Sequence, residues 1–134
     1  MPHISRIKLD KKAERNLVEN LSLILTKIKK QDEMDSFLIS LLTSTERLML
    51  AKRIAIIILL KEDVPESHIA STLHVTRVTV SRLQFFWEAR GQGYEIALKV
   101  LGNEKLMKEF KDGLLKLVAY SIRAAGGYVK PTIV

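Results

Sequence analysis

The segment from Ile54 to Leu60 is apolar at every position, and it lies between two basic residues, Arg53 and Lys61. Its seven residues (IAIIILL) are far fewer than the roughly 20 apolar residues that a membrane-spanning helix needs. A helix that is apolar on all of its faces must be buried on all of them. We therefore expect a helix from Thr43 to about Lys61 to form the centre of the fold, within one subunit or within a dimer.

Apolar residues recur at spacings of three and four through most of the remaining chain, which is the period of a helix with one buried face. Local signals mark the helix ends. Thr43 and Glu46 fit a capping box, and Asp10, Thr76 and Asn103 suit N-caps. The sequence thus predicts an all-α, multi-helix fold. The expected helices, besides the central one, span residues 10–30, 32–42, 65–73, 76–89, 94–101 and 103–126.

The composition excludes several kinds of chemistry. The chain of 134 residues contains no cysteine, which rules out disulfides, thiolate zinc sites and a cysteine nucleophile. Three histidines (His3, His68, His74) are scattered, with no acidic residue at metal-ligand spacing. Gly91 and Gly93 follow a predicted helix, whereas a phosphate-binding loop follows a strand. We expect no catalytic residues, no metal site and no enzyme.

The charge balance indicates a polyanionic partner. The net charge is +7 and the pI is about 9.7, values that favour nucleic acid or an anionic surface. The segment from Met1 to Leu9 lacks the apolar stretch of a signal peptide. We therefore expect a cytoplasmic protein with no membrane partner.

Residues 66–83 (ESHIASTLHVTRVTVSRL) show the pattern of a helix-turn-helix, which we place at about residues 65–89. Two short helices that cross steeply require an apolar and then a small residue at the crossing, here Ile69 and Ala70. Further apolar residues are expected before the turn, within it and on the inner face of the second helix. They are Leu73, Val75, Val80 and Leu83.

Two features of this motif are unusual. His74 occupies the turn position that normally holds a left-handed glycine, a conformation that costs another residue about 1–2 kcal/mol. Val78, Thr79 and Val80 favour a strand by propensity, which tertiary packing can override. A plain helical hairpin within an all-α bundle is the alternative interpretation.

The order of three segments resembles the Trp repressor superfamily, and most closely its YerC/YecD-like branch. These segments are LLTSTERLMLAKRIAIIILL, then IASTLHVTRVTVSRL, then GQGYE, and the resemblance covers about residues 33–95. It implies an all-helical, intertwined homodimer that binds DNA as a transcriptional repressor. We accordingly expect a DNA-binding domain over residues 1–101. Residues 102–134 would form a C-terminal amphipathic extension and tail.

In this interpretation the second helix of the motif enters the major groove of double-stranded DNA. Arg77 is the first candidate to read base edges, since a guanidinium can bind guanine at two points, and Val78 can contact a thymine methyl. The remaining candidates are expected at phosphates or single base contacts. They are His74, Thr76, Thr79, Ser81 and Arg82. A homodimer would read a roughly palindromic operator.

The resemblance also raises the question of an effector. Arg53 and Arg82 fall near the positions of the two arginines that hold the corepressor in the Trp repressor. Leu83, however, occupies the position of the glycine that makes room for the indole ring there. We therefore expect no cofactor, with tryptophan or another small corepressor as the disfavoured alternative. Arg53 is expected to pair with Glu46 or Glu62, and Arg82 to meet DNA.

Two other functions remain open. The chain could be a helical protein-interaction module without specific DNA binding, using its C-terminal amphipathic helix, or it could bind structured RNA by shape. Phe85, Phe86 and Trp87 could stack on bases. Because they are consecutive on a helix, we expect at least one to be buried and two to pack in the core.

Overall fold

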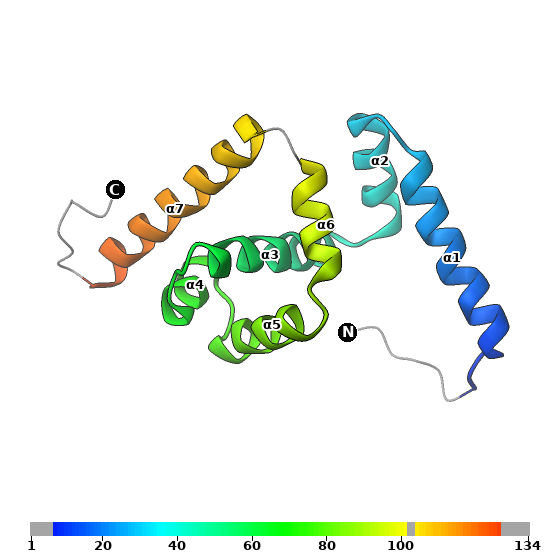
Figure 1. Ribbon diagram of the computed structural model, residues 1–134, viewed down its shortest axis with the longest axis horizontal. Helices are drawn as coiled ribbons and strands as arrows, with labels where there is room; N and C mark the ends of the chain where they lie inside the picture. The colour runs from blue at the N-terminus through cyan, green and yellow to red at the C-terminus, as the bar shows by residue number, and fades with distance from the viewer. Residues whose placement is uncertain (1–6, 102–103, 127–134) are drawn as a thin grey trace. The chain divides into compact units, whose positions relative to one another are not determined.

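The computed structural model describes residues 7–101 and 104–126, and within these ranges it contains seven helices and no strand (Figure 1). The all-α prediction is confirmed. The helices are α1 (Lys11–Lys27), α2 (Gln31–Leu41), α3 (Ser44–Lys61), α4 (Glu66–Leu73), α5 (Arg77–Arg90), α6 (Gln92–Leu101) and α7 (Glu104–Gly126). None of them is long and apolar enough to span a membrane, among the residues described.

The chain divides into two compact units, one ending at Arg47 and the other beginning at Leu48. The first holds α1, α2 and the start of α3. The predicted capping box is present there: the Glu46 amide donates to Thr43 Oγ1 (3.1 Å), and the Thr43 amide donates to a Glu46 carboxylate oxygen (2.7 Å). Asp10 precedes α1 as predicted but makes no side-chain capping bond. The domain boundary that we expected after residue 101 stays a prediction.

Neither α1 nor α2 has a buried residue, although both are amphipathic. Their large apolar side chains are exposed, and Leu17, Val18 and Ile39 are 58%, 62% and 61% exposed. Amphipathic helices whose large apolar side chains stay exposed are typical of a contact with another molecule or another subunit.

The core of the second unit gathers around the end of α3. Residues 55–59 are buried, as the all-apolar segment predicted, but Ile54 at its start is 41% exposed. Leu59 packs in one cluster with Ile69 of α4, Val80 of α5 and Val118 of α7. Figure 1 shows α3 running through the middle of this unit. The helix-turn-helix is thus assembled directly on the end of α3.

Some predicted helix ends shift by one or two residues. Pro65 is the N-cap of α4 and lies just outside it, whereas we expected it at the first helical position. Between α5 and α6 only Gly91 lies outside a helix, because α6 begins at Gln92 and includes Gly93. The predicted cap Asn103 lies outside the described residues.

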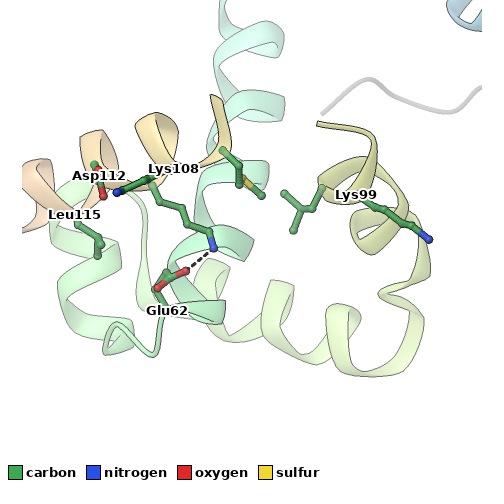
Figure 2. Close-up of a pocket in the computed structure, with 8 residues that line it drawn as sticks. Glu62, Lys99, Lys108, Asp112 and Leu115 are labelled. Atoms are coloured by element: carbon green, nitrogen blue, oxygen red, sulfur yellow. Dashed lines mark ion pairs between the residues drawn. The ribbon is translucent and has the colours of Figure 1, made fainter. Parts of the chain in front are cut away.

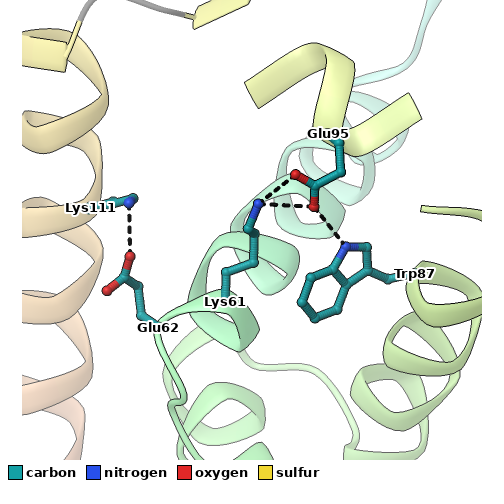
Figure 3. Close-up of polar contacts among 5 residues, drawn as sticks. All are labelled: Lys61, Glu62, Trp87, Glu95 and Lys111. Atoms are coloured by element: carbon teal, nitrogen blue, oxygen red, sulfur yellow. Dashed lines mark hydrogen bonds and ion pairs between the residues drawn. The ribbon is translucent and has the colours of Figure 1, made fainter. Parts of the chain in front are cut away.

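A polar network fixes the start of α6 (Figure 3). Glu95 of α6 accepts hydrogen bonds from Lys61 Nζ (2.8 and 2.9 Å) and from Trp87 Nε1 (3.2 Å). Both donors favour the carboxylate, Lys61 more strongly, so the pKa of Glu95 lies below its ordinary value. A single side chain thereby joins the end of α3, the last turn of α5 and the first turn of α6.

Gly91 is required where α5 passes into α6. A Cβ added to Gly91 would overlap the carbonyl oxygen and the ring Cδ1 of Trp87, whereas one added to Gly93 meets nothing within 4 Å. The Gly91→Ala substitution should therefore lower the free energy of unfolding by about 1–3 kcal/mol, the usual cost of overpacking. Gly93→Ala is the matched control. It should raise that free energy by up to about 1 kcal/mol, because alanine favours a helix more than glycine does.

Urea unfolding followed by circular dichroism measures both values. Equal effects of the two substitutions would contradict the tight junction at Gly91.

Candidate nucleic-acid interface

Helices α4 and α5 form the predicted helix-turn-helix, and the turn between them has the expected left-handed residue. His74 ends α4 with φ 54° and ψ 51°. The Val75 amide then donates to the carbonyl oxygen of Ala70 (3.0 Å), which closes the turn. The conformation that normally calls for glycine is therefore present on a histidine.

Thr76 caps the second helix as its position predicted. Its Oγ1 accepts a hydrogen bond from the Thr79 amide (3.2 Å), and the hydroxyls of Thr76 and Thr79 lie 2.9 Å apart. Both hydroxyls belong to exposed residues at the N-terminus of α5. The capped end of the helix therefore presents hydroxyls and the positive end of its dipole to solvent, an arrangement suited to phosphate.

The inner face of the motif packs as predicted. Ile69 and Val80 are fully buried at 0% exposure, and Ala70 and Leu73 are buried beside them. Val75 and Leu83 are partly buried and pack against the same cluster. The angular position of α5 about its own axis is therefore fixed by side chains that reach the core.

Because the inner face is fixed, the outer face is fixed as well. Arg77 and Ser81 are one helical turn apart, and so are Val78 and Arg82, which gives two adjacent rows on α5. All four residues are exposed, and Val78 is 64% exposed despite being apolar. The seven candidates from the sequence are thus all exposed on the turn or on α5. They are His74, Thr76, Arg77, Val78, Thr79, Ser81 and Arg82.

The structure adds Glu66, a residue that the sequence did not single out, to this surface. Ser81 Oγ donates a hydrogen bond to Glu66 Oε2 (2.8 Å), so the first residue of α4 holds a side chain of the outer row. This contact joins residues fifteen positions apart. The only local signal for it was an acidic residue in the first turn of α4.

The aromatic segment behaves differently from the prediction. Phe85 and Phe86 are 68% and 46% exposed, and Trp87 is only partly buried, so none of the three lies in the core of this chain. The two phenylalanine rings contact edge to face, with centroids 6.2 Å apart. Phe85 follows Arg82 at a spacing of three, so it extends the row that begins at Val78.

The two arginines considered for an effector are both exposed. The predicted partners of Arg53 are engaged elsewhere: Glu46 closes the capping box, and Glu62 forms an ion pair with Lys111 (2.9 Å). No ion pair of the described residues involves Arg53, so the expected pairing is wrong. Leu83 packs against the core cluster, as predicted for the inner face of the second helix.

An open pocket of about 410 Å³ lies away from the outer rows of α5, between the end of α3, α6 and α7 (Figure 2). Its apolar side chains include Leu98, Met107 and Leu115. Glu62 and Lys111, which form an ion pair (Figure 3), are among the residues that line it. No group of three or more metal-ligating side chains occurs in the part of the chain that the structure describes.

The comparisons agree with this geometry. The family model described as Trp repressor protein matches residues 16–101, which is more than half of the chain. The chain belongs to the Trp repressor family, a family of helix-turn-helix DNA-binding regulators. The searches of curated proteins and of solved structures give no match. The match ends with α6, so α7 lies outside it.

The left-handed turn residue gives a test of the motif. His74→Gly should raise the free energy of unfolding by about 1 kcal/mol. Glycine removes the strain of the left-handed conformation, and the greater entropy of glycine in the unfolded chain cancels part of that gain. His68→Gly is the control within α4, and it should lower that free energy because glycine disfavours a helix. Thermal unfolding of both variants measures the difference. Destabilisation by both would mean that His74 is not strained.

Proposed function

We propose that this member of the Trp repressor family is a sequence-specific transcriptional repressor that acts as a cytoplasmic homodimer, with α5 in the major groove of its operator. The observation that carries the proposal is the outer face of α5. A polar and basic surface at the capped N-terminus of a short helix is held at a fixed angle by Val80 on its inner face.

Each exposed residue suits a particular part of DNA. Arg77, at the first position of α5, can bind the O6 and N7 atoms of guanine, and Val78 next to it can contact a thymine methyl. Thr76 and Thr79 share one hydrogen bond between their hydroxyls, which leaves one hydroxyl proton to donate to a phosphate at the helix N-terminus. The chain's charge of +7 adds attraction to the phosphate backbone that salt weakens.

Ser81 and Arg82 differ in how freely they can bind. Ser81 is held by Glu66, so its hydroxyl proton is engaged and its oxygen is left as an acceptor for a base amino group. Arg82 is exposed and lies one turn beyond Val78. His74, in the turn, is placed to reach the DNA backbone.

The apolar surfaces of α1 and α2 support the homodimer. Both helices lack buried residues within this chain, and an intertwined dimer would cover them. We assign the chain to the YerC/YecD-like branch because of the order of its motifs. We also propose that it binds no tryptophan as a corepressor. Leu83 stands at the position where the resemblance implies the glycine that makes room for the indole ring, and this departure is the ground for expecting no bound tryptophan.

The exposed aromatics favour one alternative. Phe85 and Phe86 together form an apolar patch at the end of α5, which fits a helical protein-interaction module. Such a module would need neither Arg77 nor the capped end of α5.

Selection of bound sequences from random duplex DNA, at two salt concentrations, tests the proposal. The wild type should enrich a roughly palindromic site with half-sites about 10 base pairs apart, and its affinity should fall steeply with salt. Arg77→Ala should relax the preference at one base pair per half-site, a loss of about 1–3 kcal/mol in discrimination.

Arg90→Ala is the matched control, because Arg90 is an exposed arginine at the far end of the same helix, roughly 20 Å from Arg77. It should leave every base preference unchanged. If no site is enriched and both variants bind like the wild type, α5 does not read DNA and the interaction module is favoured. Stronger competition by structured RNA than by duplex DNA would indicate the RNA-binding alternative.

A further inference from the structure

Helix α7 has two apolar faces, and only one of them is covered in this chain. Leu114, Val118 and Ile122 face the core cluster, and Ser121 Oγ lies 3.4 Å from Ser71 Oγ of α4. The other face carries large apolar side chains that remain exposed. They are Leu106 (54%), Phe110 (42%), Leu117 (45%) and Tyr120 (70%).

The exposed face follows a seven-residue repeat. Residues 106, 110, 113, 117, 120 and 124 are separated by alternating steps of four and three, which is the spacing of a coiled-coil seam. We call these six residues the α7 seam: Leu106, Phe110, Gly113, Leu117, Tyr120 and Ala124. A single amphipathic helix on a globular core needs one apolar stripe, and α7 has a second one whose centre lies roughly 120° around the helix axis from the first.

We propose that the α7 seam pairs antiparallel with the α7 seam of a second copy of this chain. In an antiparallel pair centred between residues 113 and 117, large and small side chains alternate across the contact. Leu117 faces Gly113 of the partner subunit, Leu106 faces Ala124 of the partner subunit, and Phe110 packs on Tyr120 of the partner subunit. Each layer then holds one bulky and one small residue, or two aromatic rings.

Gly113 is explained by this pairing. Glycine in the interior of a helix costs roughly 0.5–1 kcal/mol relative to alanine. A Cβ at Gly113 would meet nothing within 4 Å, so nothing within the chain requires glycine there. In the proposed pair, Gly113 lets Leu117 of the partner subunit approach the backbone of α7 closely, and that packing offsets the cost of the glycine.

The charges beside the seam match the antiparallel direction. Glu109, Lys116 and Arg123 flank the seam on one side at intervals of seven residues. The antiparallel pair brings Glu109 beside the partner's Arg123 twice, by symmetry, and Lys116 beside the partner's Lys116 once, so two attractive contacts oppose one repulsive contact. Within one helix these two residues are about 21 Å apart, so they cannot pair with each other there.

A parallel pair is less well matched. It would place Gly113 against Gly113 of the partner subunit, which leaves a gap, and it would place Glu109 beside Leu114 of the partner subunit. Neither Glu109 nor Arg123 takes part in an ion pair among the described residues, so both are free to form one between chains.

The pairing has a consequence for DNA binding, which rests on the function proposed above. Because the inner face of α7 packs against α4, two paired α7 helices would link two helix-turn-helix motifs. Repressors bound at neighbouring operators would then assist one another's binding. The pairing itself does not depend on DNA.

The absence of cysteine allows a direct test on the full-length protein. Lys116→Cys places one thiol at the centre of the proposed contact, where a short bis-maleimide should join two chains. Lys108→Cys is the matched control, since Lys108 is an exposed lysine on the same helix but away from the seam. It should react with a single maleimide and yield no linked dimer.

Charge reversal then tests the direction of pairing. In the Lys116→Cys background, Glu109→Arg or Arg123→Glu alone should reduce the linked product roughly five- to tenfold, and the two together should restore it. Such a restoration requires contact between chains, because the two positions are too far apart within one. Leu117→Glu should abolish linking. Leu117 is 45% exposed, so this variant should keep the helical circular dichroism of the wild type.

Equal linking of the Lys116→Cys and Lys108→Cys proteins, or no restoration by the double reversal, would overturn the proposal. DNA selection with the Lys116→Cys protein separates the two ideas. Enrichment of a site by a Lys116→Cys protein that gives no linked dimer would refute the seam alone. A linked dimer from a protein that selects no site would refute the repressor function alone.

Discussion

The second unit depends on the burial of Leu59 at the end of α3 against Ile69, Val80 and Val118. These four side chains come from α3, α4, α5 and α7, and none is more than 6% exposed. Burying one such side chain contributes about 1.5–3 kcal/mol. A shared cluster of this kind fixes the mutual packing of α4 and α5 more firmly than the short turn between them could, because that turn carries a strained histidine.

The orientation of the proposed DNA-reading surface follows from this cluster. Val80 and Leu83 face the core, and the helical period then directs Arg77, Val78 and Arg82 outward. Neither arginine forms an ion pair within the part of the chain that the structure describes. Ser81 is the exception, since Glu66 holds it in place. The outer rows thus combine a rigid backbone with side chains that stay free to adapt to a base sequence, which is the combination that sequence-specific reading requires.

Features set by neighbouring residues were predictable from the sequence. The Thr43–Glu46 capping box, the Thr76 cap and the left-handed His74 depend on three or four consecutive positions, and all are present. Contacts between distant residues were not predictable, because no local pattern specifies which acid meets which base. The bonds that join Glu95 to Lys61 and Trp87 are of this kind. The Ser81–Glu66 bond and the ion pair of Glu62 with Lys111 are as well.

Periodicity shows which side of a helix is apolar, but it does not show whether that side is covered within one chain. The sequence therefore led us to place two of the three aromatics of α5 in the core, where the chain leaves Phe85 and Phe86 exposed. The same ambiguity applies to α1, α2 and α7. Two of these exposed surfaces differ in how they relate to the family match: residues 16–27 of α1 lie inside the matched residues 16–101, and α7 lies wholly outside them. The surfaces of α1 and α7 are far apart in sequence and differ in pattern. The surface of α1 can therefore serve the contacts that the family shares, while the surface of α7 serves a contact that only a chain with this helix can make.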